Sequence, residues 1–383
     1  MSLLSRIKKI KPSFEEGGRF SKFRSLFEGF ETFLYVPDKV TTRGSHIRDY
    51  MDMKRTMTVV IIALMPALLF GSYNTGLQHT RAFGIEGWTI FHMFWFGFLK
   101  ILPLIIVSYT VGLGIEFTAA QIRGHEINEG YLVTGLLIPL IMPVNVPLWM
   151  LALAVAFAVI FGKEVFGGTG MNIFNPALTA RAFLFFSYPA WMTGDRAWIS
   201  GLIGSQPVDG FSGATSLALA KAGLITKIPS VSDLFFGFIP GSIGETSVLA
   251  ILIGAVILLV TGVGSWRIML SMVLGALGMG FFLNLTGHSD YTQIPPYYHL
   301  LMGGFAFGAV FMATDPVTSA QTNTGKWIFG AVTGILVVII RVFNPAYPEG
   351  TMLAILLMNM FAPLIDHYVV EANIRRRLKR IKV

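Results

Sequence analysis

Residues 163–176 decide the fold, and they read Lys163-Glu164-Val165-Phe166-Gly167-Gly168-Thr169-Gly170-Met171-Asn172-Ile173-Phe174-Asn175-Pro176. Glycines and polar residues here interrupt two apolar runs. Asparagine before proline is typical of a helix start, with Asn175 as the N-cap and Pro176 at the first helical position. Irregular backbone at membrane depth is tolerated only where it is buried in protein or lines a cavity. We therefore expect a helix that is broken around a site.

The composition places this stretch in a membrane protein. Of the 383 residues, 54% are hydrophobic and only 13% are charged, whereas soluble domains carry about 25% charged residues. The formal net charge of +8 is concentrated at the two ends of the chain, where it flanks apolar segments. Basic residues beside a span mark its cytoplasmic side, so this pattern argues against nucleic-acid binding.

The chain contains no cysteine. Its absence excludes disulfides, thiolate-held iron–sulfur clusters and covalent c-type haem within this chain. The histidines do not form pairs suited to a haem held between helices. A redox centre in this chain is therefore most simply organic.

Hydropathy predicts an all-α polytopic membrane protein of about ten transmembrane helices, each near the ~20 residues that cross about 30 Å of hydrocarbon. The expected spans are residues 57–73, 90–116, 130–143, 147–162, 175–190, 245–262, 266–286, 297–314, 326–342 and 350–367. A second break runs from Gly303 to Pro316 and offers the same cap chemistry at Asp315. Because the two breaks are alike, we expect two five-helix blocks with broken helices.

These spans divide the chain into five parts. We expect a cytoplasmic N-terminal extension at 1–55, a first membrane block at 56–190, an outer loop at 191–244, a second membrane block at 245–370 and a basic cytoplasmic tail at 371–383. An even number of spans puts both basic ends on the cytoplasmic face. The outer loop is then expected on the periplasmic face.

The outer loop contains Asp209-Gly210-Phe211-Ser212-Gly213-Ala214-Thr215. This stretch resembles the Asp-x-x-Ser-Gly-Ala-Thr signal at which a flavin transferase esterifies FMN phosphate onto threonine. Small neighbours let a bulky transferase take up the segment, and glycine permits backbone angles that side chains forbid. An ordinary surface turn is the alternative. We expect covalent FMN on Thr215, with the acceptor signal supplied by Asp209, Ser212, Gly213 and Ala214.

The first break offers groups for a second flavin. A helix that begins at Asn175 presents unpaired backbone N–H groups and a partial positive charge, which suit negative charge on a flavin ring. Asn172 and Asn175 can pair with the uracil-like edge of that ring. Arg181 follows on the same helix, and a charged side chain inside the membrane is costly in free energy and is therefore a functional candidate. The alternatives are a purely structural break packed through glycines and an arginine that snorkels to the interface.

Few acidic residues lie at membrane depth, and the notable ones are Glu116, Asp315 and Asp366. Each can bind a cation or relay a proton. For Glu116 and Asp366, which lie near span ends, the alternative is an interfacial carboxylate. For Asp315 the alternative is a helix cap.

Taken together, these segments resemble the B-subunit family of bacterial Na⁺-translocating NADH:quinone oxidoreductases over essentially the whole chain. The resemblance is carried by the segments Ser45–Asp49, His125–Gly130, Lys163–Pro176, Arg181–Phe186, Ser212–Thr215, Pro240–Glu245 and Asn344–Gly350. The related RnfD-type subunit of ferredoxin-linked complexes shares the flavin-acceptor signal and many spans. The long N-terminal extension and the 125–130 segment favour the NADH:quinone member.

The resemblance implies covalent FMN on Thr215, non-covalent riboflavin in the membrane part, ubiquinone as the electron acceptor and Na⁺ as the pumped ion. It relates Gly112 and Glu116 to the quinone region. It relates Glu28, Asp315 and Asp366 to Na⁺ uptake. The resemblance matches the riboflavin region as a segment of sequence and not residue by residue. From this region we select the candidate riboflavin-binding residues Gly170, Asn172, Asn175, Pro176 and Arg181.

Electrons are then expected to run from FMN on the outer face of the bacterial inner membrane to quinone on the inner side. No Gly-x-Gly-x-x-Gly follows a strand and opens a helix, so NADH oxidation is expected on a partner subunit of a larger complex. A flavin transferase is the expected maturation partner. Because paired broken helices also occur in transporters, a non-redox solute transporter is the rival interpretation.

Overall fold

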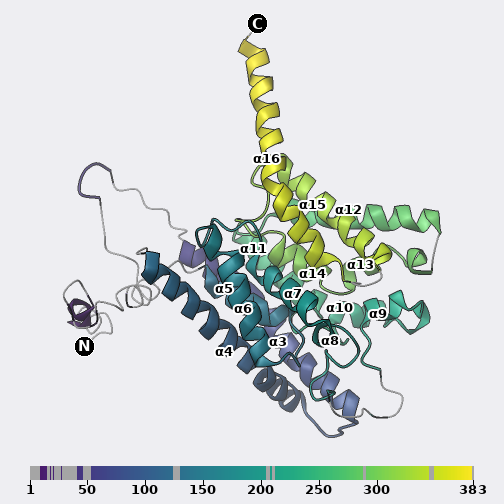
Figure 1. Cartoon of the computed structure of the whole chain (residues 1–383). Coiled ribbons are helices and arrows are strands. Elements are labelled where there is room, and N and C mark those ends of the chain that lie inside the picture. Colours follow the sequence, from purple (N-terminus) through teal and green to yellow (C-terminus); the bar gives the residue numbers. More distant parts are fainter. Residues whose placement is uncertain are drawn as a thin grey trace.

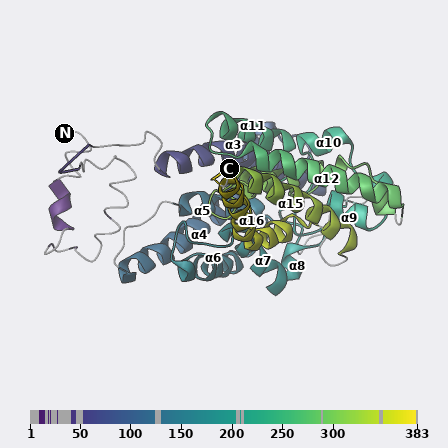
Figure 2. The same ribbon diagram turned by 90° about the horizontal axis from the view of Figure 1, so that it is seen from above.

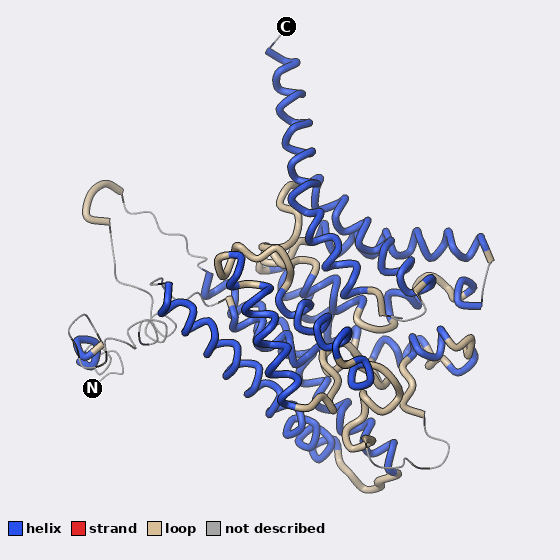
Figure 3. The backbone as a smooth tube through the Cα atoms, in the orientation of Figure 1, coloured by secondary structure: helices blue, strands red, loops and turns tan. Residues whose placement is uncertain are grey.

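The computed structural model describes residues 9–14, 18, 20, 27, 41–45, 53–123, 130–203, 208, 212–287, 290–344 and 349–381. Every regular element in these ranges is a helix (Figure 3). The all-α prediction is therefore confirmed. Most of the predicted N-terminal extension, including Glu28, lies outside the described residues.

The first half of the chain supplies the helices α3 to α8. Their bounds are α3 Met53–Phe83, α4 Ile90–Arg123, α5 Tyr131–Ile141, α6 Leu148–Gly162, the 3₁₀ turn η3 Glu164–Phe166, α7 Pro176–Ser187 and α8 Pro189–Met192. The long helices α3 and α4 extend well beyond the hydrocarbon thickness, because about 20 residues suffice to cross it. By contrast, α5 and α7 have 11 and 12 residues, so neither spans a bilayer alone.

The second half supplies the remaining helices. Their bounds are α9 Ser216–Lys221, η4 Ile225–Lys227, α10 Val231–Phe236, α11 Val248–Val260, α12 Trp266–Thr286, η5 Asp290–Gln293, α13 Tyr298–Leu301, α14 Phe305–Phe307, the π-helix η6 Gly308–Met312, α15 Asn323–Phe343 and α16 Thr351–Ile381. Each of the ten predicted spans thus coincides with a helix or, for residues 297–314, with a chain of short helical pieces. By length and composition, six helices of the described chain can cross a membrane, and α5 and α11 are shorter apolar helices.

The helices pack as two groups that lie side by side (Figures 1 and 2). Helices α3 to α7 pack mainly on one another, and α12, α15 and α16 pack on one another, whereas α11 packs mainly on α3. The two groups meet where α3 contacts α11 and where α7 contacts α16. The helices on either side of the 191–244 segment therefore interlock through α3 and α11.

Glycine allows the closest helix approach in each group. A Cβ on Gly97 of α4 would lie 1.9 Å from the carbonyl oxygen of Ser72 on α3. A Cβ on Gly334 of α15 would lie 2.1 Å from the carbonyl oxygen of Met272 on α12. Small residues that bring helix backbones together are the usual means of packing within a membrane.

The last helix extends beyond the bundle. α16 continues without interruption from Thr351 to Ile381, and its C-terminal half projects away from the other helices in Figure 1, whereas Figure 2 views it end-on. The described part of the predicted basic tail is therefore the end of this helix.

Candidate functional site

The first break has the backbone that its sequence predicts. Gly167, Gly168 and Gly170 all have positive φ values, of 119°, 96° and 91°, which only glycine adopts readily. Asn175 caps α7, because its side-chain oxygen accepts hydrogen bonds from the N–H groups of Ala177 at 3.0 Å and Leu178 at 3.3 Å. The cap prediction is confirmed.

The second break differs from its prediction in one respect. Asp315 accepts hydrogen bonds from Val317 N at 3.0 Å and from the Thr318 hydroxyl at 3.2 Å. However, no helix begins at Pro316. The chain makes one turn, closed by Ser319 N on the Asp315 carbonyl at 3.1 Å, and α15 begins only at Asn323. The cap chemistry is confirmed, and the predicted helix start at Pro316 is wrong.

The two breaks meet. The Asn175 amide nitrogen donates to the Asp315 carboxylate at 3.3 Å. A narrow cavity of about 110 Å³ lies at this junction, and its lining includes Lys163, Asn172 and Pro176. Of the residues selected for riboflavin, Gly170 lies on the exposed side of the break and does not line this cavity. Arg181 does not line it either.

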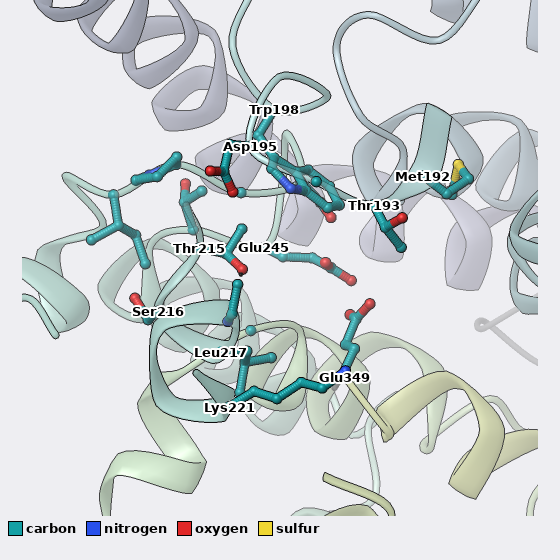
Figure 4. Close-up of a pocket in the computed structure, with 18 of the residues that line it drawn as sticks. Met192, Thr193, Asp195, Trp198, Thr215, Ser216, Leu217, Lys221, Glu245 and Glu349 are labelled. Atoms are coloured by element: carbon teal, nitrogen blue, oxygen red, sulfur yellow. Dashed lines mark hydrogen bonds between the residues drawn. The ribbon is translucent and has the colours of Figure 1, made fainter. Parts of the chain in front are cut away.

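A larger cavity, of about 460 Å³, lies beside Thr215 (Figure 4), and α7 contributes Arg181 to it from the middle of the helix. We call it the outer cavity. Its lining residues are Arg181, Met192, Thr193, Gly194, Asp195, Trp198, Thr215, Ser216, Leu217, Ala218, Lys221, Ala222, Ile239, Pro240, Gly241, Ser242, Glu245, Thr246, Gly303 and Glu349. The structure thus brings together Thr215 and Arg181, which the sequence singled out for separate reasons.

Arg181 anchors the floor of the outer cavity. Its guanidinium donates to the Glu245 carboxylate at 2.7 Å, to the Ser242 hydroxyl at 3.3 Å and to the Glu349 carboxylate. The arginine is only 3% exposed, so it does not snorkel to an interface. Buried charges require such partners, because desolvation is costly. In Figure 4 the two carboxylates point toward one another.

Glu349 is itself held by a second buried arginine. Arg341 of α15, which is 1% exposed, donates through Nε to the Glu349 carbonyl oxygen at 2.8 Å and through Nη2 to the Met302 carbonyl oxygen at 2.9 Å. These bonds fix the backbone that enters α16. The carboxylate of Glu349 is therefore set in the cavity by the fold.

Two residues of the cavity lining carry buried hydroxyls that have no hydrogen-bond partner among the described residues. They are Ser216 Oγ and Thr246 Oγ1, and their residues are 2% and 4% exposed. A buried polar group without a partner costs about 1–3 kcal/mol, and these two oxygens lie behind the cavity surface.

Thr215 itself is partly buried at the start of α9. Its hydroxyl accepts a hydrogen bond from Ala218 N at 3.3 Å. Gly213 is required by packing, since a Cβ there would lie 2.2 Å from the Asp195 carbonyl oxygen. Ser212 accepts a hydrogen bond through its hydroxyl from Ala214 N at 3.3 Å. Asp209, predicted to complete the signal, lies outside the described residues.

The residues selected for quinone lie on α4, at the end of the bundle opposite Thr215. Glu116 is 5% exposed and pairs with Lys163, which is 3% exposed. This pair contradicts the alternative that Glu116 is an interfacial carboxylate in water. A Cβ on Gly112 would lie 1.9 Å from the Tyr131 ring, whose hydroxyl donates to the Ser108 carbonyl at 2.8 Å.

Asp366 contacts the loop that follows Asp315. Its carboxylate accepts hydrogen bonds from the backbone N–H groups of Gln321 at 2.6 Å and Thr322 at 3.0 Å. It therefore stabilises the start of α15 from a neighbouring helix. In the described chain, no group of three or more acidic, histidine or cysteine side chains is arranged to hold a metal ion.

No sequence pattern predicted a role for Glu245, Glu349, Trp198, Ser216 or Thr246. Glu245 and Glu349 could have been noticed in the sequence, because each is an acidic residue shortly before an apolar helix, α11 or α16. The other three gave no such signal, since their shared cavity depends on contacts between segments far apart in the chain.

Comparisons with known proteins agree along the whole length. A family model described as the NQR2, RnfD, RnfE family matches residues 40–375. The chain is 48% identical to the B subunit of the Na(+)-translocating NADH-quinone reductase of Ectopseudomonas mendocina (strain ymp), over 99% of this chain and 100% of that relative. It is 47% identical to the protein of the same name from Pseudomonas aeruginosa (strain LESB58), with the same coverage. For the Chromohalobacter salexigens protein of that name, the identity is 46% over 99% of this chain and 97% of the relative.

Proposed function

This chain belongs to the NQR2, RnfD, RnfE family, and from that membership we propose that it is the membrane redox subunit of a Na⁺-translocating NADH:quinone oxidoreductase. In this proposal a covalent FMN on Thr215, a riboflavin in the membrane part and ubiquinone form the electron path. Electron flow along that path is coupled to Na⁺ export. The names of the full-length relatives support the quinone reductase over the RnfD-type alternative.

The observation that carries the flavin proposal is the outer cavity beside Thr215. Its volume of about 460 Å³ falls in the range of about 300–1,000 Å³ typical of small-molecule sites. Its lining combines the aromatic ring of Trp198 with the charged side chains of Glu349 and Lys221. These features fit a flat, polar-edged ring system tethered at Thr215. A bound flavin supplies one- and two-electron chemistry, which no side chain provides.

Two features support a quinone at the inner end. Glu116 and Lys163 form a buried pair that can hold a proton or donate a hydrogen bond to a quinone oxygen. Tyr131 packs against Gly112, which lies about one turn from Glu116 on the same face of α4. The residues of this end therefore combine an apolar wall with a few polar groups, as ligand sites do.

The short helix α7 connects the two ends. Asn175 and Arg181 are six residues apart, which corresponds to about 9 Å along a helix. Asn175 lies at the narrow cavity and Arg181 at the outer cavity. A cofactor in each of these two cavities would be close enough to the other to divide the path across the membrane.

The proposal for riboflavin rests on the donors at the first break. Asn172 and Asn175 line the narrow cavity, and side-chain amides can pair with a uracil-like edge once they exchange their present partners Phe174 O, Asp315 and the first N–H groups of α7. The cavity of about 110 Å³ is smaller than typical ligand sites. Riboflavin there requires the segments that line the cavity to move apart.

For Na⁺ we propose the junction of the two breaks. Asp315 is partly buried at this junction, and its carboxylate accepts hydrogen bonds from Val317, Thr318 and Asn175. A hard cation prefers such oxygen ligands. We also propose that the carboxylates of Glu28 and Asp366 belong to the path by which Na⁺ is taken up.

We further propose that the chain is a multi-pass protein of the bacterial inner membrane. Both basic ends would face the cytoplasm and the Thr215 loop the periplasm. Its partners would be the other subunits of the complex, including one that oxidises NADH, and the flavin transferase that modifies Thr215.

Flavin attachment is tested in the purified complex after denaturing electrophoresis. The wild-type band of this chain is expected to fluoresce as a flavin, and the Thr215→Ala band to be dark. Ser232→Ala, at an exposed serine of α10 outside the acceptor signal, serves as the control. A fluorescent Thr215→Ala band would reject the assignment of Thr215. A colourless wild-type chain that is fully processed would favour the solute transporter, which the paired breaks at Asn175 and Asp315 also suit.

A further inference from the structure

The C-terminal part of α16 leaves the helix bundle and is open to solvent. All residues from 372 to 380 are exposed, and the segment projects away from the other helices in Figure 1. It does not turn to lie along the bundle, because α16 is one helix from Thr351 to Ile381. The pattern of its side chains decides whether this segment is a solvated tail or a binding surface.

An apolar stripe follows one face of the projecting segment. Val370, Ile374 and Leu378 recur at every fourth residue and are 47%, 51% and 54% exposed. Because four residues make about one helical turn, the three side chains lie one above the other. Exposed apolar anchors at this spacing are typical of a helix that binds in the groove of a partner protein. A solvated tail needs no such stripe.

Basic residues surround the stripe. In residues 371–381 the single acid is Glu371, and the basic residues are Arg375, Arg376, Arg377, Lys379 and Arg380. A helix turns by about 100° per residue, so Arg375 and Arg377 flank the stripe on its two sides, whereas Arg376 is on the opposite face. Glu371 pairs with Arg375. Arg376 and Arg380 are like charges four residues apart, a spacing that destabilises a helix in water. A partner with negative charge would offset this repulsion.

The position of these charges favours a protein partner over the lipid surface. The apolar part of α16 ends at Asp366, since Asn359 is the only polar side chain in residues 352–365. Arg377 follows about 16 Å further along the helix, whereas the lipid headgroup layer is only about 5–8 Å thick on each side. The basic residues therefore reach beyond the headgroups, to a level where a water-soluble protein can bind them.

We infer that residues 370–380 of α16 form a docking helix for an acidic, water-soluble subunit, which holds the apolar stripe in a groove rimmed by carboxylates. The inference rests on the proposal that this chain works within a multi-subunit complex, and it adds the surface by which one class of partner is attached. A second copy of this chain would present the same positive charge. The N-terminal extension of the chain is basic as well, so charge disfavours both of these occupants.

The first test is photocrosslinking in the purified complex. The photoreactive residue p-benzoylphenylalanine replaces Leu378 on the stripe in one variant, and the exposed Ala372 on the opposite face in the control. We expect the Leu378 variant to crosslink to a subunit without transmembrane helices, at a peptide rich in Asp and Glu. The Ala372 variant is expected to give severalfold less of this product. A product with phospholipid, with a second copy of this chain or with its own N-terminal extension would overturn the inference, and so would the absence of any product in an intact complex.

The second test is charge reversal at two neighbouring arginines. Arg377→Glu acts beside the stripe and Arg376→Glu acts on the opposite face, so the two variants have the same net charge. The complex is passed over a gel-filtration column at increasing NaCl concentration, and its subunits are identified by denaturing electrophoresis. Because charges at an interface set the salt dependence of binding, the soluble subunit is expected to leave the Arg377→Glu complex at an about twofold lower NaCl concentration than the wild type. Arg376→Glu is expected to resemble the wild type. Equal shifts in both variants would show that net charge rather than the stripe face holds the partner, and would reject the docking helix.

The inference and the proposed complex fail in different ways. If the natural chain purifies from the bacterial membrane without other subunits, the proposed complex is wrong. If the complex is intact while the Leu378 and Arg377 variants behave like their controls, the complex stands and its soluble partner is attached elsewhere.

Discussion

Asn175 donates a hydrogen bond to Asp315 at 3.3 Å although 140 residues separate them in the sequence. Each residue belongs to a break in one of the two helix groups, so this contact joins the groups within the bundle. The two breaks therefore form one junction rather than two separate sites. A carboxylate and an amide that face a narrow cavity at such a junction are suited to bind a small cation.

Asp315→Asn is expected to shift the Na⁺ dependence of quinone reduction to higher concentration. Asparagine caps as well as aspartate, so the turn at Val317 survives while the charge is lost. Stability is expected to fall by only about 1 kcal/mol, the value of the hydrogen bond to Asn175. The measurement is turnover against Na⁺ concentration, with flavin content checked. Asp233→Asn, in the short helix α10 of the 191–244 segment, is the control. Superimposable Na⁺ curves would leave Asp315 as a structural cap.

Gly112→Ala is expected to raise the KM for quinone several-fold without loss of flavin. The new Cβ would lie 1.9 Å from the Tyr131 ring, so the ring must move and its hydrogen bond to the Ser108 carbonyl must lengthen. Gly114→Ala is a close control, because a Cβ at Gly114 has nothing within 4 Å among the described residues. An equal KM for quinone in the two variants would show that Gly112 is not part of the quinone site.

The buried pair of Glu116 and Lys163 is expected to behave as a coupled unit. Removing one partner leaves an uncompensated buried charge, which costs about 3–5 kcal/mol. Lys163→Met and Glu116→Gln should each lower thermal stability strongly, and the double variant should lose much less than the sum. Glu371→Gln, which removes the exposed partner of Arg375, is expected to cost less than about 1 kcal/mol. Additive losses in the double variant would show that the two charges act independently.

The orientation in the membrane can be tested with single cysteines, because the natural chain has none. Ser232 is exposed on α10, and Ser232→Cys is expected to react with a membrane-impermeant thiol reagent in intact cells. Arg376→Cys, near the end of α16, is expected to react only after the cells are opened. The opposite pattern would place the Thr215 loop in the cytoplasm.

Local chemistry made much of the fold predictable. Runs of apolar residues located ten helical segments, because a chain in a bilayer must satisfy its backbone within each segment. Asn175 before Pro176 predicted the start of α7, since the cap is made by neighbouring atoms. The family resemblance inferred from the sequence segments is likewise confirmed.

Contacts between distant segments were less predictable. The prediction of a helix at Pro316 failed because the loop after Asp315 is tied to Asp366 on α16, and Thr322 rather than Asp315 caps α15. The outer cavity was not foreseen, because Arg181, Glu245 and Glu349 come from three separate parts of the chain. The sequence indicates that Arg181 is a costly charge, but only the fold supplies its partners.

The proposed electron path begins with a covalent flavin on Thr215 at the outer cavity. Mass spectrometry of the Thr215-containing peptide from the purified complex tests this attachment most directly. We predict a peptide heavier than its sequence by one FMN minus one water, with fragment ions that assign the phosphoester to Thr215. An unmodified peptide from an active, flavin-replete complex, or a flavin located on another residue of this chain, would contradict it.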